Sequence, residues 1–270
     1  MMYKEGDTVS VNFPEAFKWF LKAAEQGNAT AQQEVAAAYA AGRGVLQSER
    51  LAAEWSLKAA NGGDEDAKFA TAENYRIGRG VKQDIRSAIV WYGKMTNTVR
   101  SDLMEGLCYS IALGELRRGA EALRRAAKNN SAAAKTLLGT MHEFGEGVEK
   151  DQGVSIRLFQ EAAYQGEPIA QHNLAICTLK GDRLERNIAQ GFMWMYLAAS
   201  YIPEAKGALT LYERSDWAQF LPEGARRAKQ FRPKEDPTKD SFDWAALKNT
   251  PNWLRIQDAN PESVLGHKAR

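Results

Sequence analysis

The chain is 270 residues long, and 44% of its residues are hydrophobic and 26% are charged, which is typical of a folded globular protein. Its 36 lysines and arginines almost balance its 34 aspartates and glutamates, which leaves a net charge of +2. Nucleic-acid binding requires concentrated positive charge, so this balance argues against a nucleic-acid partner. No stretch approaches the ~18 to 20 apolar residues of a membrane span. We therefore expect no membrane insertion.

The sequence repeats itself at a fixed interval. Residues 39–60 read YAAGRGVLQSERLAAEWSLKAA, and residues 75–96, 36 positions later, read YRIGRGVKQDIRSAIVWYGKMT. Self-similarity at a period of roughly 20 to 50 residues is typical of stacked-repeat proteins. An anchor glycine marks each copy, and the steps between copies are 36, 36, 36, 31 and 36 residues: Gly6, Gly42, Gly78, Gly114, Gly145 and Gly181.

Each copy predicts two helices joined by a turn. The chain begins inside a repeat, of which residues 6–27 are the later part. The first complete copy has an alanine-rich segment at 29–42, a Gly-x-Gly-Val turn, and a second segment at 48–63 with apolar residues three and four apart. The anchor glycine is expected to end the first helix in a left-handed conformation. Short polar residues, six positions later, are expected to cap the second helix: Asn12, Ser48, Asp84, Asp151 and Asn187.

A large apolar residue recurs thirteen positions after each anchor glycine, except in the copy that follows Gly114: Trp19, Trp55, Trp91, Leu158 and Trp194. Alanine pairs follow it in most copies. A tryptophan that recurs at the same position of each repeat is more often part of the hydrophobic core than of a ligand-binding surface. We therefore interpret the indoles as filling space between neighbouring helices, while the small alanines let those helices approach closely.

The later part of the chain departs from the pattern. The copy after Gly114 reads GELRRG in place of the usual turn and is five residues shorter. After Tyr201 the repeat fades, and residues 201–232 predict capping helices with Pro203 and Pro222 in first-turn positions. From residue 233 onward we predict an irregular tail, helical only briefly around 243–249. Its Trp244 and Trp253 are expected to pack on the array or on a partner.

The consensus A-x-x-x-L-G-x-x-Y-x-x-G-x-G-V-x-x-D-x-x-x-A-x-x-W-Y-x-x-A-A-x-x-G resembles the Sel-one-like repeat (SLR), a relative of the tetratricopeptide repeat (TPR). The clearest matches are residues 136–166 and 6–27, and the resemblance covers roughly residues 1–200. It implies an all-α fold, an α/α superhelical solenoid of about five and a half helix-turn-helix repeats, of which the first is incomplete. In the copy after Gly114 the resemblance implies a local geometry closer to that of a plain TPR.

The residues that carry chemistry form no catalytic or metal pattern. The histidines, His142, His172 and His267, lack the spacing of a zinc site or of a Cys/His dyad, and the first two are expected on helix surfaces. The GRGV and GEGV turns lack the Lys-Ser/Thr ending of a phosphate loop. Cys108 and Cys177 lie two repeats apart and are expected to be free thiols. We therefore predict a protein that is not an enzyme and has no cofactor and no metal.

The resemblance implies a binding surface, because the first helices of such repeats line a concave groove that binds proteins or peptides. Groove positions carried over from the TPR begin with Thr30, Gln33, Ala37 and Ala40 in the first complete copy. The candidate partner-binding residues of the later copies are Phe69, Glu73, Arg76, Asp102, Glu105, Tyr109, Thr140, Glu143, Phe144, His172 and Lys180. They mix aromatic and charged side chains, which suits an interface with anchors and a polar rim.

Two roles remain open at this stage. As an adaptor, the protein would hold a partner protein or peptide in the groove to assemble a complex. As an immunity protein, a role known among bacterial SLR proteins, it would neutralise a secreted effector such as a lipase toxin. The sequence as written carries no export signal, which predicts a cytoplasmic protein. An export signal trimmed from the incomplete first repeat would make the protein periplasmic.

Overall fold

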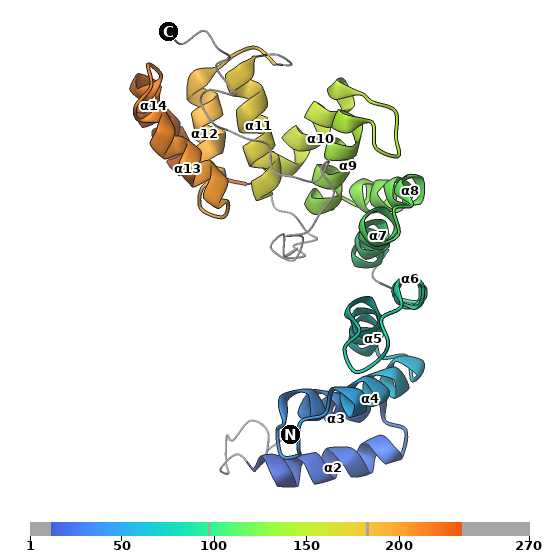
Figure 1. Cartoon of the computed structure of the whole chain (residues 1–270). Helices are drawn as coiled ribbons and strands as arrows, with labels where there is room; N and C mark the ends of the chain where they lie inside the picture. The colour runs from blue at the N-terminus through green and yellow to red at the C-terminus, as the bar shows by residue number, and fades with distance from the viewer. Residues whose placement is uncertain (1–11, 97, 182–183, 234–270) are drawn as a thin grey trace. The chain divides into compact units, whose positions relative to one another are not determined.

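The computed structural model describes residues 12–96, 98–181 and 184–233 (Figure 1). The described chain is all-helical and contains thirteen α-helices, α2 to α14, most of which pack against their neighbours along the chain. Contacts divide the chain into two compact units, residues 1–108 and 109–270, and we describe each unit by itself. The helical fold predicted from the repeats is confirmed.

The first unit contains three helix pairs. The helices are α2 (Phe13–Glu25), α3 (Ala29–Ala41), α4 (Glu49–Asn61), α5 (Glu65–Ile77), α6 (Ile85–Gly93) and α7 (Thr98–Leu107). In repeat terms, α3, α5 and α7 are first helices, and α2, α4 and α6 are second helices. Each first helix therefore has a second helix before it in the chain.

The second unit continues the alternation. Its helices are α8 (Leu116–Lys128), α9 (Ala132–Phe144), α10 (Gln152–Tyr164), α11 (Pro168–Lys180), α12 (Ile188–Ala198), α13 (Pro203–Tyr212) and α14 (Leu221–Gln230). A short 3-10 helix, Ala218–Phe220, precedes α14, and α14 packs against α12. Pro203 and Pro222 lie in the first turns of α13 and α14, as predicted.

The predicted caps of the second helices are confirmed. Each of the five side chains accepts a hydrogen bond from a backbone N–H in the first turn of its helix, for example Ser48 from Leu51 and Asp84 from Arg86 and Ser87. Such a cap satisfies an N–H group that has no partner within the helix. The first helices α3, α5, α9 and α11 are capped too, which the sequence analysis did not predict, by Asn28, Asp64, Ser131 and Glu167, respectively.

Both turn glycines have defined tasks. The anchor glycine adopts a left-handed conformation after α3, α5, α9 and α11, with φ of 66° to 78°. A residue with a Cβ atom is strained in this backbone conformation. The second glycine makes a contact between repeats. A Cβ at Gly44, Gly80 or Gly147 would lie closer than 3.0 Å to the backbone of Phe13, Glu49 or Leu116, respectively. These three are the first residues of α2, α4 and α8, so each turn rests on the second helix of the preceding repeat.

The shortened copy differs in its helix ends. Its first helix, α7, continues into a π-helix, Cys108–Ala112, before Gly114, which keeps a left-handed φ of 68°. The side chain of Glu115, at the N-cap of α8, makes no capping hydrogen bond and instead pairs with Arg118 at 2.7 Å. The five missing residues come from the turn, because α8 begins two residues after Gly114, whereas α4 and α10 begin seven residues after Gly42 and Gly145.

The tryptophan column is buried progressively along the chain. Trp19 is 57% exposed, Trp55 is half-buried, Trp91 is almost buried, and Trp194 is 1% exposed. Around Trp194, an apolar cluster of the second unit includes Phe159, Phe192 and Tyr212. The core interpretation therefore holds for Trp91 and Trp194, whereas Trp19 lies at the surface.

Candidate protein-binding surface

The groove positions are the residues that lie 12, 9, 5 and 2 positions before an anchor glycine, on the first helix of each repeat. In the first unit they include the predicted Phe69, Glu73 and Arg76 on α5, and Asp102 and Glu105 on α7. All but Asp102 are partly exposed. The α5 residues lie on one helix face because they are separated by four and three positions.

Glu73 is the centre of a hydrogen-bonded cluster. Arg76 donates from Nε and Nη2 to the two carboxylate oxygens of Glu73, at 2.9 and 2.6 Å. The hydroxyl of Tyr92, which reaches across from α6, donates to the same carboxylate. The Arg76 and Glu73 side chains remain 34% and 22% exposed. A bidentate pair of this kind fixes both side chains in one geometry.

Arg100 extends this cluster and was not predicted. Its guanidinium carbon lies 3.4 Å from the centroid of the Phe69 ring, and Phe69 in turn lies 6.0 Å from the ring of Tyr92. Arg100 is in the first turn of α7 and is not at a groove position, so the repeat pattern gave no signal for it. We call Phe69, Glu73, Arg76, Tyr92 and Arg100 the α5–α7 cluster.

Electrostatics keep the charges of the α5–α7 cluster fixed. Burial alone would raise the pKa of Glu73, but hydrogen bonds from Arg76 and Tyr92 and the charges of Arg76 and Arg100 lower it below its ordinary value. Burial, followed by the neighbouring Glu73 charge, raises the pKa of Tyr92. Burial also raises the pKa of the nearby Cys108 thiol to about 12. At neutral pH the cluster therefore presents two guanidinium groups, one carboxylate and an aromatic ring, with the phenol and the thiol protonated.

The remaining predicted residues lie in the second unit. Tyr109 accepts a hydrogen bond from Arg118 at 2.8 Å, and the same guanidinium stacks at 4.2 Å from its ring. Phe144 is exposed and Lys180 is half-buried, whereas Thr140 and Glu143 on α9 are buried. His172, expected on a helix surface, is instead fully buried on α11. These residues belong to the second unit, whereas the α5–α7 cluster belongs to the first.

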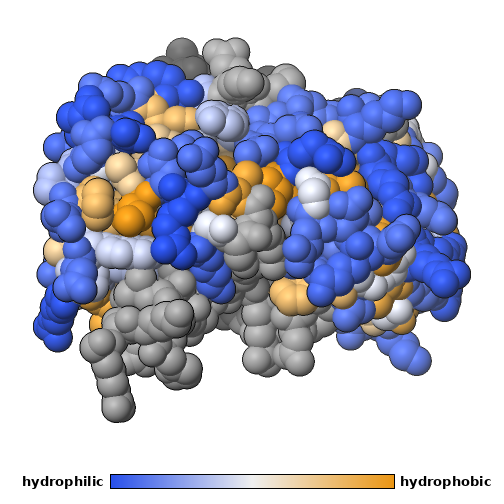
Figure 2. All heavy atoms as spheres, turned by 90° about the horizontal axis from the view of Figure 1, so that it is seen from above, coloured by the Kyte–Doolittle hydropathy of each residue, from blue (hydrophilic) through white to orange (hydrophobic). Residues whose placement is uncertain are grey.

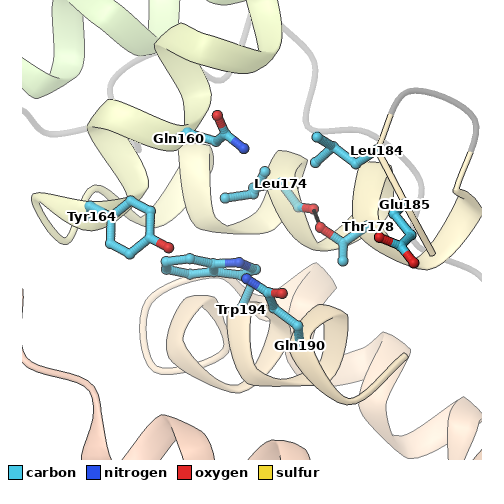
Figure 3. A pocket seen from close by; sticks show the side chains of 8 residues that line it. All are labelled: Gln160, Tyr164, Leu174, Thr178, Leu184, Glu185, Gln190 and Trp194. Carbon is cyan, nitrogen blue, oxygen red and sulfur yellow. Dashed lines mark hydrogen bonds between the residues drawn. The ribbon is translucent and has the colours of Figure 1, made fainter. Parts of the chain in front are cut away.

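A small cavity lies in the second unit between α10, α11 and α12 (Figure 3). Its volume is about 190 Å³, the size of a single side chain, and the Tyr164 ring lies edge-on to Trp194 with centroids 5.1 Å apart. The sequence analysis did not predict it. Its lining residues are Gln160, Tyr164, Leu174, Thr178, Leu184, Glu185, Gln190 and Trp194.

The face seen in Figure 2 is mainly hydrophilic, with hydrophobic residues visible among the hydrophilic ones. Among the described residues, no cluster of histidine, cysteine or acidic side chains has the arrangement of a metal site. None of the described helices combines the length and the apolar character that crossing a bilayer requires. Both cysteines, Cys108 and Cys177, are buried free thiols, as predicted.

Comparison with solved structures finds the same fold. A protective antigen of uropathogenic Escherichia coli, described as displaying an SLR fold, matches with a TM-score of 0.68 and 25% identity over 85% of this chain. This chain spans only 52% of that antigen. A Sel1 repeat protein from Oxalobacter formigenes matches with a TM-score of 0.64 and 23% identity, over 81% of this chain and 91% of that one. No curated protein matches the sequence significantly.

The family model of the Sel1 repeat matches five segments: residues 1–28, 29–64, 66–97, 132–167 and 168–200. The unmatched residues 98–131 contain the shortened copy with its π-helix and its uncapped α8. The matched segments cover more than half of the chain, and their helix-turn-helix units, caps and glycine turns are those seen in the structure. The chain therefore belongs to the Sel1 repeat family.

Proposed function

We propose that this protein is a non-catalytic scaffold that binds a partner protein or peptide on the groove face of its first unit. The observation that supports the proposal is the α5–α7 cluster, in which an aromatic ring and three fixed charges share one partly exposed surface. A balanced net charge and a mixed-charge surface suit a protein partner better than a polyanion.

The geometry of the cluster favours recognition. Arginine and aromatic residues dominate the binding energy of protein interfaces, especially where neighbouring contacts exclude water. The Arg100–Phe69 stack and the Arg76–Glu73 pair already hold their side chains in place, so binding loses less side-chain entropy than it would with mobile groups. The guanidinium groups suit carboxylates or backbone carbonyls of a partner, and the Phe69 ring suits an apolar side chain.

The function is tested with the double variant Phe69→Ala/Arg100→Ala. Full-length protein is used to capture a partner, and the affinity of the purified pair is measured by calorimetry. We expect the double variant to weaken binding by at least about ten-fold, or about 1.4 kcal/mol, because it removes the ring and the cation stacked on it. Far-ultraviolet circular dichroism should remain unchanged.

Leu46→Ala is the matched control, because Leu46 is exposed in a turn outside the groove face. It should leave the affinity unchanged. Equal affinity for wild type and the double variant would remove the first-unit groove as the binding surface. The absolute affinity then separates the two roles, since a toxin inhibitor needs nanomolar or tighter binding while an adaptor functions at micromolar affinity.

A further inference from the structure

One position of the first helices changes its residue type along the chain. Three residues before the anchor glycine stand Tyr39 on α3 and Tyr75 on α5, but His142 on α9 and Thr178 on α11. The carbonyl of each accepts a hydrogen bond from the N–H of the residue that caps the next second helix, at 2.9 to 3.3 Å. The backbone therefore makes Thr178 the structural equivalent of the two tyrosines.

In the first unit, a phenol ring fills the space beside this position. Tyr39 packs in an apolar cluster of the first unit. The cluster also contains Leu21 of α2, Val35 of α3 and Trp55 of α4. The Tyr39 ring lies edge-on to the ring of Phe17, with centroids 5.4 Å apart. The tyrosine side chain thus packs where one second helix, the following first helix and the next second helix meet.

In the second unit, the equivalent space is a cavity. Counted from the anchor glycines, the equivalents of those three cluster residues are Gln160, Leu174 and Trp194. All three line the cavity of about 190 Å³ between α10, α11 and α12, and so does Thr178 (Figure 3). Threonine lacks the ring of tyrosine, and the Thr178 hydroxyl stays on its own helix, where it donates to the Leu174 carbonyl at 2.7 Å. The cavity therefore lies where the ring of a tyrosine packs in the first unit.

The size and the apolar walls of this cavity suit one aromatic ring. A cavity of roughly 150 Å³ holds one benzene molecule, so this cavity has room for a ring with one substituent. Leu174 and Leu184 supply aliphatic contacts, and Trp194 and Tyr164 supply aromatic ones. These two rings already meet edge to face, with centroids 5.1 Å apart, which is an arrangement that aromatic rings prefer.

The polar walls of the cavity favour a hydrogen-bond donor. Thr178 gives its one hydroxyl proton to the Leu174 carbonyl, so toward the cavity its oxygen can only accept a hydrogen bond. The Glu185 carboxylate also accepts, and the amides of Gln160 and Gln190 complete the polar lining. A phenol carries a donor on an aromatic ring, whereas the side chain of phenylalanine carries none. A phenol therefore matches both the size of the cavity and its acceptors.

We propose that this cavity receives the side chain of a tyrosine from a partner protein. The partner then supplies in the second unit the ring that Tyr39 supplies within the first. An ammonium group would also donate to these acceptors, but the Glu185 carboxylate is exposed to water, so a cation would gain little from it. The inference concerns the second unit alone and does not rest on the α5–α7 cluster.

Titration of the full-length chain with p-cresol, which is the tyrosine side chain as a free molecule, tests the proposal. Ligand-observed NMR measures its affinity. We expect saturable binding with a dissociation constant of about 1 mM or tighter, which is within the range for so small a ligand. Toluene, which lacks the hydroxyl, should bind about three- to ten-fold more weakly because it leaves the acceptors without a donor. n-Butylammonium, the equivalent of a lysine side chain, should also bind about ten-fold more weakly, because an exposed carboxylate attracts it only weakly.

Variants at Thr178 locate the binding. Thr178→Tyr should abolish p-cresol binding, because its own ring then occupies the cavity as Tyr39 does in the first unit. Thr210→Tyr is the matched control and should leave the affinity unchanged, because Thr210 is exposed on α13 and its hydroxyl donates to the carbonyl four residues earlier, as that of Thr178 does.

Thr178→Val provides a second variant that keeps the size of the side chain and removes the acceptor. It should weaken p-cresol binding by about three- to ten-fold and leave the affinity for toluene unchanged. Far-ultraviolet circular dichroism checks that each variant is folded.

Three results would overturn the proposal. The absence of saturable p-cresol binding, or binding that survives Thr178→Tyr, would show that the cavity takes no ring. Binding of toluene or n-butylammonium as tight as that of p-cresol would identify a site for an apolar or a cationic side chain instead. An affinity for p-cresol that falls as the protein concentration rises, and recovers in Tyr201→Ala, would identify the exposed Tyr201 of a second copy as the occupant.

Discussion

The second turn glycine is the residue at which one repeat touches the repeat before it. At Gly80 a side chain would collide with the backbone of Glu49, 31 residues earlier, and Gly44 and Gly147 have the equivalent contact. The anchor glycines and the caps could be predicted, because their partners lie within a few residues of them in sequence. The contact made by the second glycine could not be predicted, because a turn motif does not show which distant segment of backbone lies against it.

Gly80→Ala should therefore lower the free energy of unfolding by more than the strain of a left-handed alanine alone would. Gly114 is the control, because its φ of 68° nearly equals the 69° of Gly80 and nothing lies within 4 Å of a Cβ placed there. We expect Gly114→Ala to lower the free energy of unfolding by about 1 kcal/mol and Gly80→Ala to lower it by about 1 to 3 kcal/mol more. Urea unfolding of both variants measures the difference, and equal losses would contradict the inter-repeat contact.

At the scale of the helix, equivalent tryptophans have unequal roles. Trp19 on α2 is largely exposed, whereas Trp194 on α12 is enclosed by Tyr164 and by Phe231 from beyond α14. The period predicted a column of similar residues with one structural role. It could not predict that the exposure of these tryptophans decreases along the chain. Phe231, which covers Trp194, lies outside the repeat, and its packing depends on where the chain turns after α14.

Truncation of the two indoles should show this inequality. Trp194→Ala should lower the free energy of unfolding by about 3 to 5 kcal/mol, since it leaves a large cavity among Tyr164, Phe231 and their neighbours. Trp19→Ala should cost less than about 1 kcal/mol, because most of that indole already contacts water. Denaturant unfolding of both variants provides the measurement. Similar losses would mean that Trp19 is buried in solution.

At the scale of the whole molecule, the chain consists of two units with one buried cysteine in each, Cys108 and Cys177. These thiols can report the unfolding of each unit separately. The all-helical repeat fold could be predicted from the repeat, and so could the partly exposed position of Phe69, Glu73 and Arg76 on α5. The burial of Thr140, Glu143 and His172 could not be predicted, because groove positions were carried over as equivalent, and Arg100 was missed because it is not at a groove position.

Glu73→Gln should destabilise the first unit alone and change its pH dependence. The pKa of Glu73 is lowered in the folded chain, so its ionised form stabilises the unit above its ordinary value near 4.5, and this contribution is lost as the pH falls through the folded pKa. At pH 7 the variant should lose about 1 to 2 kcal/mol, because charge-assisted hydrogen bonds from Arg76 and Tyr92 become neutral ones.

The accessibility of the thiols in increasing urea measures this effect. A dithiodipyridine reagent, which reacts with thiols even in acid, should modify Cys108 at lower urea in the variant than in wild type at pH 7. The difference should shrink toward pH 3. The urea dependence of Cys177 modification is the internal control and should not change. A parallel shift at Cys177 would show that the two units unfold as one.

The backbone contact between repeats also bears on how such an array tolerates change. The second glycine faces Phe13, Glu49 and Leu116 in the three repeats, and it approaches their main-chain atoms and, at Leu116, the Cβ atom as well. A phenylalanine, a glutamate and a leucine can all occupy this junction, because the contacting atoms are ones that every residue type except glycine carries. Side chains on the rest of a repeat's surface can therefore change without removing this contact between neighbouring repeats.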